Sequence, residues 1–127
     1  MISKYLMIAS SIVTGILGVA VSFFPQEISN TLGLAPTGTL TLFLQITGAL
    51  YIGFALMNWM AKTVIIGGIY ARPLAMGNFA HFVIAGIALI KAAMNNPVSL
   101  YLWIIAIIYL VFAVLFGKIL FTNPIKK

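Results

Sequence analysis

Four long apolar segments constrain the fold of this chain more than any other feature of its sequence. They cover residues about 5–24, 39–60, 73–94 and 98–121. An α-helix rises 1.5 Å per residue, so roughly 20 residues cross the hydrocarbon core of a bilayer, which is about 30 Å thick. The segments lack the alternation and turn spacing of a membrane barrel. The sequence therefore predicts an all-α, four-helix transmembrane bundle that forms one integral membrane domain, residues 1–127.

The composition agrees with a membrane protein. Hydrophobic residues make up 63% of the chain and charged residues only 6%, whereas roughly a quarter of the residues in soluble domains are charged. The first apolar segment is about twice as long as the apolar part of a secretory signal, and Ala20-Val21-Ser22 is a poor cleavage site. We therefore expect the first segment to remain as a helix.

Basic residues predict the orientation in the membrane. With four crossings, the two termini and the middle connection share one side of the bilayer. The six basic residues of that side are Lys4, Lys62, Arg72, Lys118, Lys126 and Lys127. The other side has only Lys91, together with the acidic Glu27. This bias predicts a multi-pass protein of the inner (plasma) membrane with both termini in the cytoplasm. The net charge of +6 is scattered, with no basic helix face, so we expect no nucleic-acid partner.

Two of the connections have a predicted structure of their own. Pro25 to Gly33 has the pattern of a brief interfacial helix, with a proline at its start and a glycine at its end. The connection Ala61 to Arg72 is too apolar for a loop in water. We expect it to lie in the interface or across the cytoplasmic end of the bundle, and a re-entrant loop is the alternative.

Small residues follow one face of the first helix. Ser10, Thr14, Gly18 and Ser22 are each four residues apart. Such a stripe lets another helix approach closely and offers hydroxyls for bonds between helices. We expect a helix-packing seam rather than the other interpretation, a substrate path. The helix of residues 98–121 is bulky throughout and is predicted to be the most lipid-facing or oligomer-facing of the four.

Polar residues near the cytoplasmic ends of the middle helices form a candidate ligand-binding cluster. Its members are Asn58, Arg72, Asn78 and His81, with Tyr51 deeper in the membrane. Arg72 suits an anionic headgroup, with Asn78 and His81 hydrogen-bonding its neighbouring oxygens. The imidazole of His81 is also able to transfer protons. The alternative is that these side chains hold the helices together.

The sequence offers no catalytic constellation. One histidine, no cysteine and one remote Glu27 do not make an ordinary catalytic metal site, so we expect no metal, no cofactor and no catalytic residues. The chain contains no phosphate-binding loop, dinucleotide fingerprint or nucleophile elbow. No acidic residue lies within a span, which argues against a proton-coupled small multidrug exporter.

The middle of the chain resembles a known group of proteins. The relevant residues are Leu44–Ala55, Asn58-Trp59 and Arg72-Pro73 leading into Gly77-Asn78-Phe79. Together they resemble a family of small four-helix bacterial inner-membrane proteins that is broadly DoxX-like. The resemblance covers roughly residues 25–91, and it implies a fold and a bacterial membrane without implying catalytic residues or a substrate.

Three functional hypotheses remain open on the sequence. The leading hypothesis is a non-catalytic component that binds membrane lipids or partner helices, as a homo-oligomer or as an accessory subunit of a larger membrane complex. The second is an oligomeric channel or small-solute transporter, with the faces of Gln45 and of Asn78 and His81 along its path. The third is a membrane enzyme or sensor that uses His81 on a lipid or quinone-like ligand.

Overall fold

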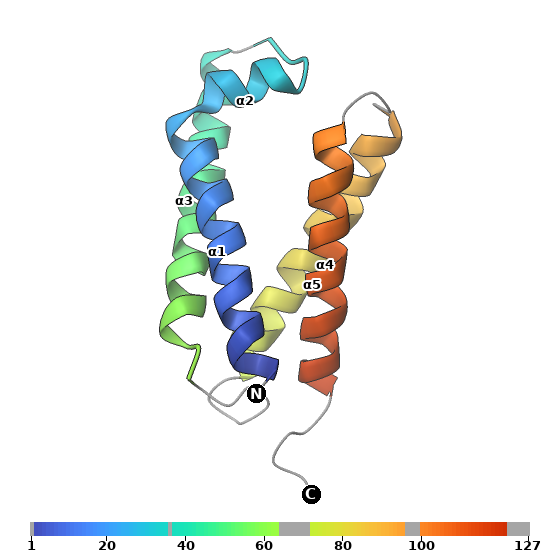
Figure 1. Cartoon of the computed structure of the whole chain (residues 1–127). Coiled ribbons are helices and arrows are strands. Elements are labelled where there is room, and N and C mark those ends of the chain that lie inside the picture. The colour runs from blue at the N-terminus through green and yellow to red at the C-terminus, as the bar shows by residue number, and fades with distance from the viewer. Residues whose placement is uncertain (1, 36, 64–71, 96–99, 122–127) are drawn as a thin grey trace, which may run out of the picture. The chain divides into compact units, whose positions relative to one another are not determined.

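The computed structural model describes residues 2–35, 37–63, 72–95 and 100–121. Five helices follow one another along the chain, and no strand occurs in these ranges (Figure 1). They are α1 (Ile2–Phe23), α2 (Pro25–Thr31), α3 (Gly38–Met60), α4 (Arg72–Asn95) and α5 (Leu100–Phe121). The four longest, α1, α3, α4 and α5, are each long and apolar enough to cross a membrane. The predicted all-α architecture with four membrane-spanning helices is therefore confirmed.

Local signals in the sequence account for the helix ends. The hydroxyl of Thr37 accepts a hydrogen bond of 3.1 Å from the backbone N–H of Leu40, which caps the start of α3. Pro25 begins α2, the short helix expected in this connection, and Gly33 follows it with a φ of 78°. The first helix begins at Ile2, a little before the predicted start. Most of the connection between Ala61 and Arg72 lies outside the described residues, so its predicted placement stays a prediction.

The chain divides into two compact units, and each is described by itself. One unit is Met7–Lys62, which contains most of α1 together with α2 and α3. The other is Met1–Leu6 with Thr63–Lys127, which contains α4 and α5.

Glycines bring α1 and α3 into backbone contact. A Cβ atom added at Gly18 would lie 2.9 Å from the backbone nitrogen of Ile52. A Cβ atom added at Gly48 would lie 2.8 Å from the carbonyl oxygen of Gly18 and would also meet the side chain of Ser22. As the contacts advance along α1 from Gly18 to Ser22, their partners on α3 move back from Ile52 to Gly48, so α1 and α3 run antiparallel (Figure 1). Only glycine permits so close an approach at these two positions.

Aromatic side chains and small residues alternate where α4 packs on α5. A Cβ atom added at Gly117 would lie 2.8 Å from Cε1 of Phe79, and one added at Gly86 would lie 3.3 Å from Cδ2 of Leu110. The buried residues of α5 repeat at intervals of about three and four along one face. They are Ala106, Tyr109, Phe112, Ala113, Phe116, Gly117 and Leu120.

The prediction that residues 98–121 form the most lipid-facing helix is wrong. α5 has seven buried residues, whereas α3 has three, Gly48, Ala55 and Asn58. The reason is that Gly117 leaves room for the ring of Phe79 from α4. A helix that is apolar on every side gives no sequence signal for which side is buried.

We expect Gly48→Ala to destabilise the α1–α3 pair, because the added methyl group meets the backbone of α1. The expected loss in the free energy of unfolding is about 1–3 kcal/mol. Gly38→Ala is the control in the same helix, because a Cβ atom there meets no atom within 4 Å among the described residues. The measurement is unfolding of the purified protein in mixed detergent micelles. Equal stabilities of the two variants would contradict the close packing at Gly48.

Candidate functional site

A buried hydrogen bond joins α1 to α3. The side-chain amide nitrogen of Asn58 donates to the hydroxyl oxygen of Ser10 over 3.0 Å, and both residues are fully buried. The hydroxyl of Ser10 in turn donates to the carbonyl oxygen of Met7 over 3.1 Å. The serine thus accepts from one helix and donates within its own, so its hydroxyl is satisfied on both counts.

The other hydroxyls of this face of α1 bond to their own helix. Ser11 donates to the carbonyl oxygen of Ile8 over 2.7 Å, and Thr14 donates to that of Ser10 over 2.8 Å. Of the four small residues that mark the predicted seam, Ser10, Gly18 and Ser22 lie against α3, while the buried Thr14 bonds within α1. The structure therefore places these residues in a helix-packing interface.

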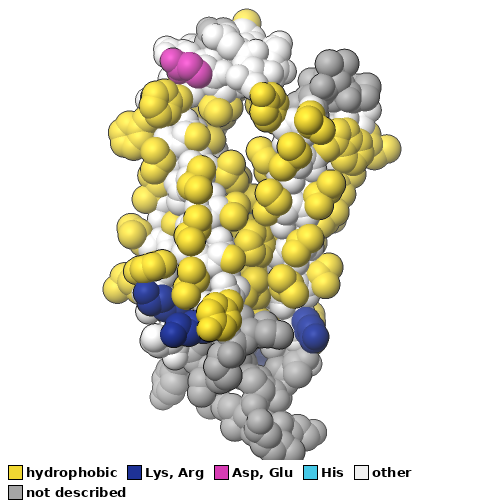
Figure 2. All heavy atoms as spheres, in the orientation of Figure 1, with side chains coloured by type: hydrophobic (Ala, Val, Ile, Leu, Met, Phe, Trp, Pro, Cys, Tyr) yellow, Lys and Arg dark blue, Asp and Glu magenta, His cyan; other side chains and the backbone are white. Residues whose placement is uncertain are grey.

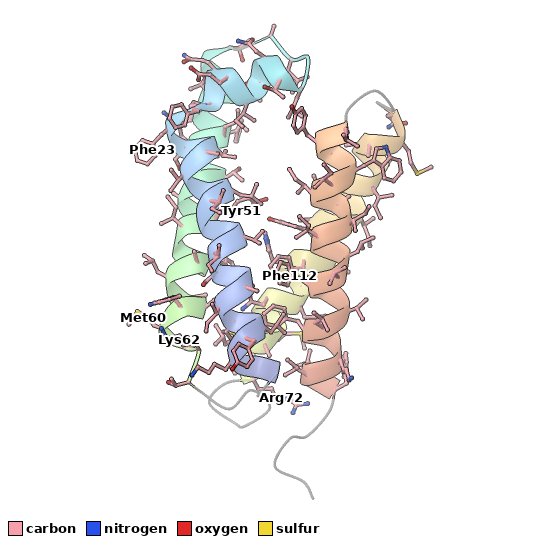
Figure 3. The ribbon with its side chains drawn as sticks, in the orientation of Figure 1. Phe23, Tyr51, Met60, Lys62, Arg72 and Phe112 are labelled. Carbon is pink, nitrogen blue, oxygen red and sulfur yellow. The ribbon has the colours of Figure 1, made fainter. Side chains whose placement is uncertain are left out.

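The predicted polar residues of α4 lie along its first half. Arg72 is the first residue of the helix and is exposed (Figure 3). Asn78 is buried, and its amide nitrogen donates to the carbonyl oxygen of Leu74 over 3.0 Å. His81 follows Asn78 by one turn of the helix and is half-buried.

His81 pairs with a tyrosine of α5. Its Nε2 atom lies 3.3 Å from the hydroxyl oxygen of Tyr109, which is fully buried. Depending on the tautomer of the imidazole, either the phenol or the ring N–H is the donor. Both residues lie nine positions after the first residue of their helices, which is about 13 Å along each helix. The pair therefore lies deep within the two spans.

Phe82 fills the space around this pair. Its ring centroid is 4.9 Å from that of Tyr109 at an interplanar angle of 77°, and 5.0 Å from that of Phe112. Phe116 stacks on it at 5.7 Å and 13°. Aromatic pairs of this kind contribute about 0.5–1.5 kcal/mol each beyond the area they bury. The cluster makes a rigid apolar wall beside the imidazole of His81.

The five residues of the predicted ligand cluster fall in two different units. Tyr51 and Asn58 belong to Met7–Lys62, whereas Arg72, Asn78 and His81 belong to the other unit. Each unit has its own polar contact, that of Asn58 with Ser10 and that of His81 with Tyr109. A common site formed by all five residues stays a prediction.

Tyr109 is the residue that the sequence analysis missed. It sits in the middle of the span, where every other residue from Ile104 to Phe116 is aliphatic or phenylalanine, away from the interfacial belts where tyrosine is common. A hydroxyl at that depth needs a hydrogen-bond partner. The signal was therefore present in the sequence, because His81 lies at a similar depth of a neighbouring span.

The polar groups described inside the spans are amides, hydroxyls and one imidazole, and they form hydrogen bonds. Among the described residues, no three of His, Cys, Asp and Glu come together as a metal site, and no buried side-chain nitrogen or oxygen lacks a partner. Amides and hydroxyls that satisfy one another hold helices together. Contacts within and between helices are therefore enough to explain why these polar side chains lie within the spans.

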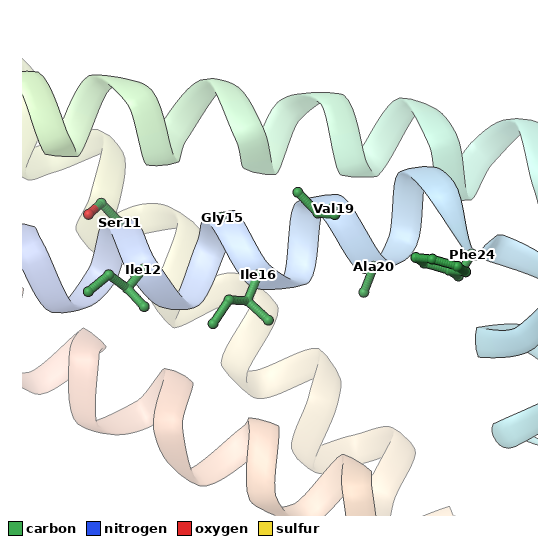
Figure 4. Close-up of a pocket in the computed structure, with 7 residues that line it drawn as sticks. All are labelled: Ser11, Ile12, Gly15, Ile16, Val19, Ala20 and Phe24. Atoms are coloured by element: carbon green, nitrogen blue, oxygen red, sulfur yellow. The ribbon is translucent and has the colours of Figure 1, made fainter.

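An apolar hollow of about 610 Å³ runs along α1 and is open along its length. Figure 4 shows Ile12, Ile16 and Ala20 pointing away from α3. The residues that line the hollow are Ser11, Ile12, Gly15, Ile16, Val19, Ala20 and Phe24. The hydroxyl of Ser11 already donates to its own helix, so the hollow offers shape and apolar surface to a ligand.

We expect Tyr109→Phe to weaken the α4–α5 pair, because His81 then loses a hydrogen-bond partner inside the membrane. The expected loss in the free energy of unfolding is about 0.6 kcal/mol and at most about 1.7 kcal/mol. Tyr101→Phe is the control, since Tyr101 lies on the same helix and is 63% exposed. Denaturation in mixed detergent micelles measures both variants, and a larger loss for Tyr101→Phe would contradict the role given to Tyr109.

Comparison with known proteins returned no relatives. No model of a known protein family matches the chain. No curated protein matches it, and no solved structure matches it. The likeness to small four-helix bacterial inner-membrane proteins therefore stays a prediction from the sequence.

Proposed function

We propose that this protein is a non-catalytic component of a bacterial inner membrane that binds lipids or partner helices. The main support for the proposal is that buried polar side chains form hydrogen bonds between helices of the same chain. Asn58 bonds to Ser10 and His81 bonds to Tyr109, each pair joining two helices. Polar groups used in this way stabilise the helices and need no substrate to satisfy them.

The outer surface supports the membrane as the solvent. On the face shown in Figure 2, hydrophobic side chains run along the long helices, and charged side chains are confined to the helix ends. Large apolar residues are exposed on every long helix, such as Ile16 (65%) on α1, Leu50 (61%) on α3, Ile84 (69%) on α4 and Val114 (69%) on α5. Water would not tolerate so much exposed apolar surface, whereas lipid chains cover it at no cost.

Charges support an orientation with both termini in the cytoplasm. Six of the seven basic residues belong to the side that holds the termini and the middle connection. At the end of α3 on that side, Nζ of Lys62 lies 3.5 Å from the centre of the Trp59 ring. A lysine over a tryptophan is a typical anchor at the membrane–water interface, where one partner is charged and the other amphipathic.

The hollow along α1 supports the binding of lipid. Its volume of about 610 Å³ is within the range of small-molecule sites, and its lining is apolar. In a bilayer, acyl chains are the apolar groups present at the highest concentration. We propose that a lipid chain occupies this hollow, and that the protein belongs with the small four-helix, broadly DoxX-like membrane proteins that its middle segment resembles.

Native mass spectrometry of the protein released from lipid nanodiscs tests the proposed function. We expect species that carry bound phospholipid, a second protein chain or both, and we expect Ile16→Trp, which fills the α1 hollow, to reduce the bound lipid. Ile84→Trp, at an exposed position of α4, is the control and should leave the lipid bound. A protein recovered only as a monomer without lipid or partner would reject the proposal.

Labelling of single cysteines tests the orientation, and the chain has no cysteine of its own. We expect a membrane-impermeant maleimide added to intact spheroplasts to label Gln26→Cys in α2. Lys4→Cys and Lys118→Cys should react only after the membrane is permeabilised, because both lie on the predicted cytoplasmic side. Labelling of the two lysine positions on opposite sides would overturn the four-crossing topology.

A further inference from the structure

Gln45 is a polar residue on the outer surface of a membrane span. It lies in α3, four residues before Ala49 near the middle of the helix, and it is exposed. Its carboxamide forms no hydrogen bond within the part of the chain that the structure describes. By contrast, the two buried amides of the spans, those of Asn58 and Asn78, both have partners.

The position of Gln45 leaves its amide in hydrocarbon. A helix that spans the membrane has its middle, here Ala49, near the centre of an apolar layer with a half-thickness of about 15 Å. Gln45 is four residues, or about 6 Å, from that centre, which leaves about 9 Å of hydrocarbon between it and the edge of the layer. A glutamine side chain extends only about 5 Å from its Cα atom, which is too short to reach the headgroups. An amide without partners in lipid is unfavourable, and lipid chains have no group with which to pair it.

Gly53 is a second feature of α3 that no contact among the described residues explains. A Cβ atom added at Gly53 meets no atom within 4 Å in the described ranges, in contrast to one added at Gly48. Glycine within a helix is less stable than alanine, so a glycine usually marks a close approach of another backbone. Ala49 lies one turn before Gly53 and is also exposed, which makes a small residue at every fourth position.

We propose that α3 binds α3 of a second copy of this protein through the face of Gln45, Ala49 and Gly53. The inference rests on the proposed function, since it names one of the partner helices. All copies insert in the membrane with the same orientation, so two α3 helices pair in parallel and Gln45 meets Gln45 at the same depth. A carboxamide both donates and accepts, so the two amides satisfy each other.

The remainder of this face fits a helix pair. Leu42 (55% exposed), Leu56 (60%) and Met60 (79%) lie on the same side of α3 as Ala49. Small residues at Ala49 and Gly53 let the two backbones approach, while the longer side chains pack on either side of the contact. A second copy therefore explains three observations. The amide of Gln45 has no hydrogen bond in the described ranges, Gly53 contacts no other helix there, and the apolar side chains beside them are exposed.

Disulfide cross-linking in native membranes tests the pairing, and the absence of cysteine from the chain gives a clean background. Ala49→Cys places a thiol on the proposed face, and Leu50→Cys places one at nearly the same depth but about 100° around the helix. With an oxidant such as iodine we expect a covalent dimer from Ala49→Cys at least about tenfold more abundant than from Leu50→Cys. Equal yields, or no dimer from Ala49→Cys, would overturn the inference.

Energy transfer between labelled copies, diluted stepwise in lipid vesicles, measures the strength of the pair. We expect Gln45→Leu to raise the dissociation constant about 3- to 20-fold, the range for one hydrogen bond between membrane helices. Phe43→Leu, on an exposed part of α3 away from this face, should leave the constant unchanged. A strict monomer that still carries lipid, or a chain that pairs only with another protein, would reject self-association and leave the proposed function standing. A monomer with neither lipid nor partner would reject both.

Discussion

Backbone N–H and C=O groups have no water to bond with inside a bilayer, so each must find a partner within the protein. A single helix satisfies nearly all of them by itself. This constraint explains why α1, α3, α4 and α5 are uninterrupted for more than twenty residues each, and why Pro25 and Gly33 are found in the connections rather than within these four spans. Everything else in the structure concerns how such helices recognise one another.

Two different devices join the helices into pairs. Between α1 and α3 the device is the absence of side chains, since Gly18 and Gly48 let the two backbones touch, and the bond between Asn58 and Ser10 sets the register. Between α4 and α5 it is aromatic packing around Phe82, with the bond between His81 and Tyr109 at its edge. Helices of this length and hydropathy belong in a bilayer, where the packing within a pair gains little from the hydrophobic effect. Close packing and a buried hydrogen bond supply the specificity in each.

Polar residues inside the spans therefore divide into two groups according to their partners. Asn58, Asn78 and His81 have hydrogen bonds to side chains or backbone of their own chain. Gln45 faces outward on α3 without one in the described ranges. The first group explains how the chain folds in a membrane. Gln45 is the residue through which we propose that a second copy binds.

Much of this protein was determined by its sequence alone. The four spans follow from segment length and hydropathy, the short α2 follows from Pro25 and Gly33, and the small-residue face of α1 is visible as a spacing of four. These features depend on residues close together in the chain, which is why a linear pattern predicts them.

Only the tertiary structure decided which side of each helix meets another. α5 is apolar all around, so its sequence could not show that Tyr109, Phe112 and Phe116 face α4. The bond of Asn58 to Ser10 was also out of reach, because the sequence groups Asn58 with the polar residues of α4 and gives no sign of a bond to α1. Partner choice depends on the rotation and register of whole helices. The rotation and register are set by many small contacts across the interface, and a local sequence pattern does not reveal contacts between residues far apart in the chain.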